Sequence, residues 1–117
     1  MQTEFIQLIV ILGAMGALLI VMGSICIKGK LPMNSLVGIR LPATTVSEEA
    51  WGAGHKAAGP YVIMGGICSA AGAAAIPLFP TLEPPTLASI TAGGVVLFIV
   101  VAAFVASGAA KRESLSE

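Results

Sequence analysis

The stretch PMNSLVGIRLPATTVSEEAWGAGHKA, residues 32–57, is the longest polar interruption in a chain that is otherwise apolar. It contains the single His and the single Trp of the protein. Four of the six Lys and Arg residues lie in it or just before it, namely Lys28, Lys30, Arg40 and Lys56. We therefore expect any recognition by this protein to involve this segment, and the rest of the chain to hold the segment in place.

The composition around this segment is typical of a membrane protein. Of the 117 residues, 56% are apolar and only 10% are charged, whereas about 25% of an ordinary soluble domain is charged. A soluble protein of this length could not bury so much apolar surface. The formal net charge is zero, which argues against a nucleic acid partner, because phosphate binding needs clustered Lys and Arg. The composition predicts one all-α membrane domain over residues 1–117.

The chain contains apolar runs long enough to cross a bilayer, which takes about 20 residues of helix. The predicted transmembrane spans are residues 5–27, 59–79 and 86–109, and none of them contains Asp, Glu, Lys, Arg or His. Proton relays and ion-coupled transporters usually need such groups within the membrane, so their absence argues against a pump, a transporter or an ion channel. No basic residue precedes the first run, which favours a retained helix over a signal peptide.

The Lys and Arg residues all fall on one side of this predicted topology. Those of the central segment lie between the first and second spans, and Lys111 and Arg112 follow the third. The N-terminal tail and the turn at 81–85 contain none. The positive-inside rule therefore predicts that the N-terminus is outside and the C-terminus inside the cell, with the segment 28–58 on the cytoplasmic side.

The central segment divides into two parts. Residues 31–45 contain Pro32, Gly38 and Pro42, which favour irregular or extended backbone. Ser47 to Ala58 is typical of a short amphipathic helix at the membrane interface, with Ser47 as its N-cap and acidic residues in its first turn.

A helical wheel separates this predicted helix into two faces. The apolar face holds Val46, Ala50, Trp51, Gly54, Ala57 and Ala58. The polar face holds Glu48, Glu49, Gly52, His55 and Lys56. Trp51 is the predicted interface anchor, because its ring is apolar with one polar edge.

The order of residues across the segment resembles a known family motif. The matching residues are Asn34, Gly38, Ile39, Arg40, Pro42, Thr44, Ser47, Glu49, Trp51 and His55, followed by a membrane helix. They are similar to the SdpI family of small bacterial membrane proteins, and the resemblance covers nearly the whole chain. That family is named after an immunity protein that protects a cell from its own secreted killing peptide and helps to sequester a transcriptional repressor at the membrane. The resemblance implies one helix, a motif loop and two further helices in a bacterial inner membrane.

The resemblance implies a non-enzymatic role, either immunity to a membrane-active peptide or envelope stress signalling through the loop. The expected partners are membrane lipid, a peptide toxin, and a membrane protein or further copies of this chain. The residues predicted to bind a partner or lipid are Asn34, Gly38, Arg40, Thr44, Trp51 and His55.

Each of these residues also has a structural interpretation. The planar guanidinium of Arg40 suits a lipid phosphate or a peptide carboxylate, but it could instead pair with Glu48 or Glu49, or extend to the interface. Asn34 and Thr44 are also typical of turns and caps. His55 is also typical of an interfacial, hydrogen-bonded histidine.

We predict no catalytic, cofactor or metal site. A lone His without a nearby Cys, Asp or second His is a poor metal ligand. As a base, His55 would need a partner, and Glu48 two turns earlier is the candidate. An interfacial enzyme that uses His55 and Arg40 on a lipid-linked substrate remains the least favoured alternative. Cys26 and Cys68 lie in apolar runs and are expected to behave as small apolar residues.

Small residues recur at four-residue spacing in the predicted spans. The series are Gly13 and Ala17; Gly65, Ser69 and Ala73; Gly66, Ala70 and Ala74; and Ala102, Ala106 and Ala110. Such spacing lets membrane helices approach closely. It predicts packing within one helical bundle or, alternatively, contact with further copies or with a larger complex, in which this chain would be an accessory subunit.

Overall fold

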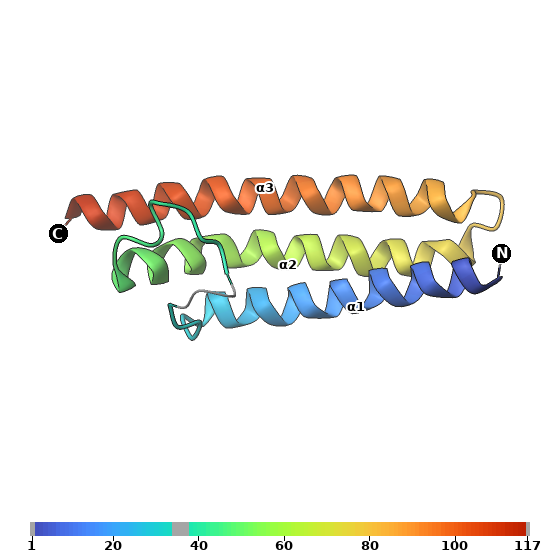
Figure 1. Cartoon of the computed structure of the whole chain (residues 1–117), viewed down its shortest axis with the longest axis horizontal. Helices are drawn as coiled ribbons and strands as arrows, with labels where there is room; N and C mark the ends of the chain where they lie inside the picture. The colour runs from blue at the N-terminus through green and yellow to red at the C-terminus, as the bar shows by residue number, and fades with distance from the viewer. Residues whose placement is uncertain (1, 34–37, 117) are drawn as a thin grey trace.

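The protein is a bundle of long helices. The computed structural model describes residues 2–33 and 38–116, in which it has three helices, α1 (Gln2–Ile27), α2 (Glu48–Leu78) and α3 (Pro84–Ser116). Each helix is long and apolar enough to cross a membrane. The molecule is a rod of 55 × 19 × 19 Å (Figure 1). The prediction of an all-α membrane protein with three transmembrane helices is confirmed.

The middle helix in the sequence is also the central helix of the bundle. Both α1 and α3 pack along α2, and they have few contacts with one another. The N-terminus lies at the same end of the rod as the α2–α3 turn, while the α1–α2 loop and the C-terminus lie at the other end (Figure 1). The segment before α2 is therefore joined to the helix that packs against both of the others.

Glycines bring the backbones of α1 and α2 into direct contact. A Cβ at Gly23 would lie 2.8 Å from the carbonyl oxygen of Gly59, and a Cβ at Gly66 would lie 2.8 Å from that of Gly16. These pairs are crossing points that no larger residue allows without separating the helices. Gly66 belongs to the predicted small-residue series, whereas Gly16 and Gly23 do not.

The other small residues divide between buried and exposed positions. Gly65, Ser69, Ala73, Ala102, Ala106 and Ala110 are all buried. The Ser69 hydroxyl donates to the carbonyl of Leu12 at 2.6 Å and so joins α2 to α1. These positions pack within one molecule. Exposed small residues are Ala17, Ala70 and Ala74, and a Cβ at Gly13 would meet nothing within 4 Å.

The segment predicted as a separate interfacial helix is instead the beginning of α2. That helix starts at Glu48 and continues through Pro60 to Leu78. The predicted span began at residue 59, next to Pro60, but membrane helices tolerate an internal Pro where their neighbours pack against them. The 31 residues of α2 correspond to about 46 Å at 1.5 Å per residue. Because the hydrocarbon core is about 30 Å thick, α2 is longer than is needed to cross it.

Candidate functional site

The α1–α2 loop covers the first turns of α2. The helix α1 does not extend far enough to cover these turns itself. The side chain of Ile27, the last residue of α1, lies against Gly59. The part of α2 before Gly59 therefore has no helix of α1 beside it, and the loop crosses there (Figure 1). Buried residues on this part of α2 are Ala50, Trp51, Gly54, His55 and Ala58. The loop thus completes the bundle at this end.

Ser47 fixes the point where the loop becomes helix. Its side chain accepts the N–H of Ala50 at 3.0 Å, which is the bond expected of an N-cap. Glu48 and Glu49 follow in the first turn and are exposed, where the helix dipole favours negative charge. The predictions for these residues are confirmed.

Trp51 holds the beginning of the loop. Its indole N–H donates to the carbonyl of Leu31 at 3.1 Å, and its side chain is only 1% exposed. The ring stacks on that of His55 with centroids 4.1 Å apart. The prediction that Trp51 anchors the protein in the lipid interface is therefore wrong, because the loop, rather than lipid, covers this face of the helix.

His55 holds the middle of the loop. The N–H of Ile39 donates to its Nε2 at 2.8 Å, and its Nδ1 lies 2.8 Å from the carbonyl of Trp51. A backbone N–H can only donate, so Nε2 must carry the lone pair and Nδ1 the proton. The imidazole is therefore neutral, and the protein backbone occupies both of its nitrogens.

The helical wheel placed His55 on the polar face, and this prediction is wrong. The side chain is 2% exposed, because the residue lies one turn after Trp51 on the face that the loop covers. The proposed pairing with Glu48 also has no support, since Glu48 is exposed. With its lone pair already accepting from Ile39, Nε2 is not available as a base or as a metal ligand.

Gly38 brings the main chain directly onto this pair of rings. Its φ is +113°, a conformation that residues with a side chain rarely adopt. A Cβ there would lie 2.8 Å from Nε2 of His55 and 2.9 Å from Cζ2 of Trp51. Conformation and space therefore both require glycine, and this explains the Gly that precedes Ile39 and Arg40 in the motif.

Thr44 closes the second half of the loop. Its hydroxyl accepts the N–H of Leu41 at 3.0 Å, and the carbonyls of Ile39 and Leu41, at 2.8 and 3.0 Å, are acceptors within reach of its proton. The side chain is fully buried. A Cβ at Gly54 would lie 3.1 Å from the Thr44 methyl group and 2.9 Å from the carbonyl of Ala106. Thr44 is therefore wedged where α2 meets α3, in the turn-forming role that its residue type favours.

The remaining predicted residues lie elsewhere. Arg40 is exposed and follows Ile39, which is half-buried against the core of α2 and α3. Lys56 is exposed on α2. Asn34 lies outside the described residues. The structure thus brings together Gly38, Thr44, Trp51 and His55, and leaves Arg40 on the outside of the loop.

The polar groups of this cluster hold the loop on α2. Among the residues that the structure describes, every buried side-chain nitrogen and oxygen has a hydrogen-bond partner. The same residues contain no group of three or more His, Cys, Asp or Glu that could hold a metal ion. Sequence reasoning missed the backbone groups of Leu31 and Ile39, which have no residue-type signal, and it placed Gly54 on the apolar face without counting it among the site residues.

Comparison with known proteins gives a family. The model of the SdpI/YfhL protein family matches residues 30–109, which cover the loop from Lys30 onward, all of α2 and most of α3. A search of curated proteins and a search of solved structures each found no match.

Proposed function

The chain belongs to the SdpI/YfhL protein family, and from this premise we propose that it contributes non-enzymatically to protection of a bacterium from a membrane-active peptide, or to envelope stress signalling through the loop. It is a membrane protein of the SdpI type. We further propose that it resides in the inner membrane with its N-terminus outside and its C-terminus inside the cell.

The observation that carries this proposal is that the motif residues hold the loop against α2. The indole of Trp51 bonds to the Leu31 carbonyl and the imidazole of His55 to the Ile39 N–H, so these two points of the loop are held on α2 without any partner. A surface that is already ordered loses less conformational entropy on binding. Arg40 and Lys56 are exposed on it, and their charge suits lipid phosphate or an acidic partner.

The hydrogen bonds of His55 and Thr44 to backbone groups support a non-enzymatic role. Nε2 of His55 accepts a backbone N–H, and the Thr44 hydroxyl is buried among backbone partners. A general base needs a free lone pair and a nucleophile needs access to substrate. Neither residue offers this in the folded loop.

The decisive experiment is deletion of the gene, followed by challenge with a broad panel of membrane-active peptides. We expect increased sensitivity to at least one peptide, reversed by a copy of the gene. Unchanged sensitivity across the whole panel would contradict the protective role, and an unchanged envelope stress response in the same strain would contradict signalling as well.

A second candidate is an accessory subunit of a larger membrane complex. It is favoured by the small residues that the bundle leaves exposed, Ala17, Ala70 and Ala74, because close approach of another helix needs such positions. Purification in mild detergent tests it. A partner recovered in fixed proportion would support this role, and a chain that elutes alone would contradict it.

A further inference from the structure

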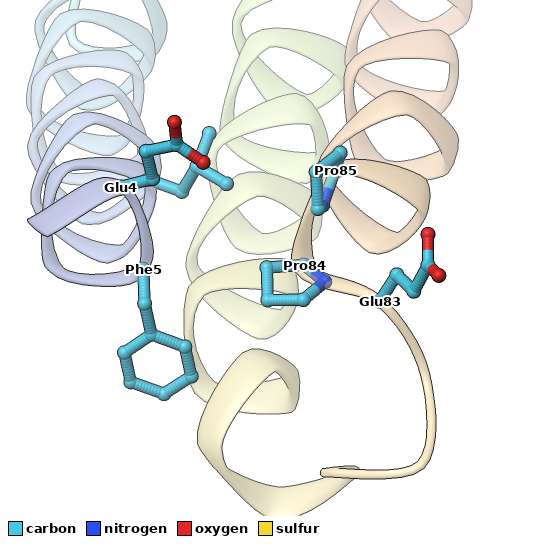
Figure 2. Close-up of a pocket in the computed structure, with 6 residues that line it drawn as sticks. Glu4, Phe5, Glu83, Pro84 and Pro85 are labelled. Carbon is cyan, nitrogen blue, oxygen red and sulfur yellow. The ribbon is translucent and has the colours of Figure 1, made fainter. Parts of the chain in front are cut away.

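A groove lies between α1 and α3 at the end of the rod opposite the loop. Its first cavity, of about 210 Å³, is lined by Glu4, Phe5, Leu8, Glu83, Pro84 and Pro85 (Figure 2). A neighbouring cavity of about 390 Å³ shares Glu4, Leu8 and Pro85 and continues along the helices to Ile11 and Ala88. The groove exists because α1 and α3 both pack on α2 and have few contacts with one another.

The charged side chains that the structure describes at this end are both acidic. Glu4 lies on α1 and Glu83 at the end of the turn, on either side of Pro84 and Pro85 (Figure 2). The Lys and Arg side chains of the protein all lie toward the loop end, at positions 28, 30, 40, 56, 111 and 112. The groove is therefore mainly apolar, with Gln7 and Ser89 as polar lining residues, and it is bordered by carboxylates at its mouth.

We propose that this groove is the docking site of a cationic amphipathic peptide. Apolar side chains of the peptide lie against Leu8, Ile11 and Ala88, and its basic side chains meet Glu4 and Glu83. Peptides that act on membranes commonly combine a Lys- or Arg-rich face with an apolar one. The biological role of this site rests on the protective function proposed above. The site lies at the end of the molecule opposite the motif residues.

Charge complementarity selects this occupant over two others. The phosphate of a phospholipid would be repelled by both carboxylates. A second copy of the chain inserted in the same orientation would place its own Glu4 and Glu83 at the same depth, so that like charges would face each other. The loop is a poorer site for a cationic peptide, because four basic residues, Lys28, Lys30, Arg40 and Lys56, lie in or beside it and outnumber the exposed carboxylates of Glu48 and Glu49.

Binding to the purified full-length chain tests the docking site. The protein is placed in phosphatidylcholine nanodiscs, whose lipids have no net charge, and a dye-labelled amphipathic helix of leucine and lysine is titrated by fluorescence anisotropy. We expect Glu4→Gln/Glu83→Gln to weaken binding by between about twofold and thirtyfold, the range that two exposed ion pairs provide. Added salt should weaken wild-type binding toward that of the double variant.

The matched control removes the same charge at the other end. Glu48 and Glu49 are also exposed, and Glu48→Gln/Glu49→Gln should bind as the wild type does. If the two double variants weaken binding equally, or if Glu4→Gln/Glu83→Gln binds within twofold of the wild type, the groove is not the site.

A protection assay in cells that carry the same two double variants distinguishes the docking site from the protective function. Loss of protection in Glu4→Gln/Glu83→Gln but not in Glu48→Gln/Glu49→Gln would support both. Full protection by Glu4→Gln/Glu83→Gln would overturn the docking site and leave the protective function standing. Groove-dependent binding in nanodiscs, without any change in sensitivity on gene deletion, would overturn the function and leave the site standing.

Discussion

At the scale of single residues, Gly38 is a position where a small change has a large expected effect. It has a positive φ and lies against the rings of Trp51 and His55. We expect Gly38→Ala to destabilise the folded loop by about 1–3 kcal/mol, the cost of strain combined with overpacking. The emission of Trp51, the single Trp, should shift to the red as the loop detaches.

Gly52→Ala is the control for this substitution. Gly52 lies in α2, and a Cβ there would meet nothing within 4 Å. Alanine is favoured over glycine inside a helix by up to about 1 kcal/mol, so this variant should be as stable as the wild type or more stable. If Gly38→Ala and Gly52→Ala melt alike and emit alike, the loop does not lie on the rings as described.

His55 has a structural role that a second substitution tests. In His55→Ala the N–H of Ile39 loses its acceptor and Trp51 loses its stacking partner. An unpaired, part-buried donor costs about 1–3 kcal/mol, and we expect a lower midpoint of thermal unfolding in detergent, with red-shifted Trp51 emission. The exposed neighbour Lys56→Ala should change neither quantity. A His55→Ala variant that is indistinguishable from Lys56→Ala would contradict the hydrogen bonds assigned to the imidazole.

At the scale of helices, the contact between α1 and α2 depends on glycine. A Cβ at Gly23 meets backbone atoms of α2, including the Gly59 carbonyl at 2.8 Å, and backbone cannot rotate aside as a side chain can. We expect Gly23→Ala to lower the free energy of unfolding by about 1–3 kcal/mol, as overpacking does. Gly13→Ala, on the same helix but with open space around it, should have no destabilising effect. Steric trapping in bicelles measures both, and equal stability of the two variants would contradict the crossing point.

The helices themselves were predictable from the sequence, because uncharged apolar runs of this length have few alternatives. The start of α2 was only partly predictable. Ser47 was correctly predicted as the cap, but the predicted division between a short helix ending at Ala58 and a span beginning at residue 59 was wrong, because α2 continues through Pro60. The choice of Gly16 and Gly23 as contact points depends on how the helices are rotated, which the weak amphipathicity of these sequences does not specify.

The site was predictable as a set of residues but not as an arrangement. The motif singled out Gly38, Thr44, Trp51 and His55, which lie together. The helical wheel then misplaced His55, because it assumes water on the polar side, whereas the loop supplies hydrogen-bond partners there. The Ile39 N–H that donates to His55 and the Leu31 carbonyl that accepts from Trp51 are both backbone groups. A backbone group is the same at every residue, so the sequence contains no sign of it.

At the scale of the whole molecule, the two ends of the rod differ in charge and in the surface they offer. The loop end has the motif and the Lys and Arg side chains, and the opposite end has the groove with Glu4 and Glu83. The proposed docking site needs these ends on particular sides of the membrane: the groove outside, where a peptide arrives, and the loop inside. The positive-inside rule predicts this orientation.

Cysteine labelling of intact cells tests this orientation most directly. Val46 in the loop is 64% exposed and Leu82 in the α2–α3 turn is 46% exposed, so Val46→Cys and Leu82→Cys place a reactive thiol at each end. With a membrane-impermeant maleimide, we expect Leu82→Cys to be labelled in intact cells and Val46→Cys only after the cells are permeabilised. Labelling of Val46→Cys in intact cells, with Leu82→Cys protected, would show that the protein has the opposite orientation and would contradict the account.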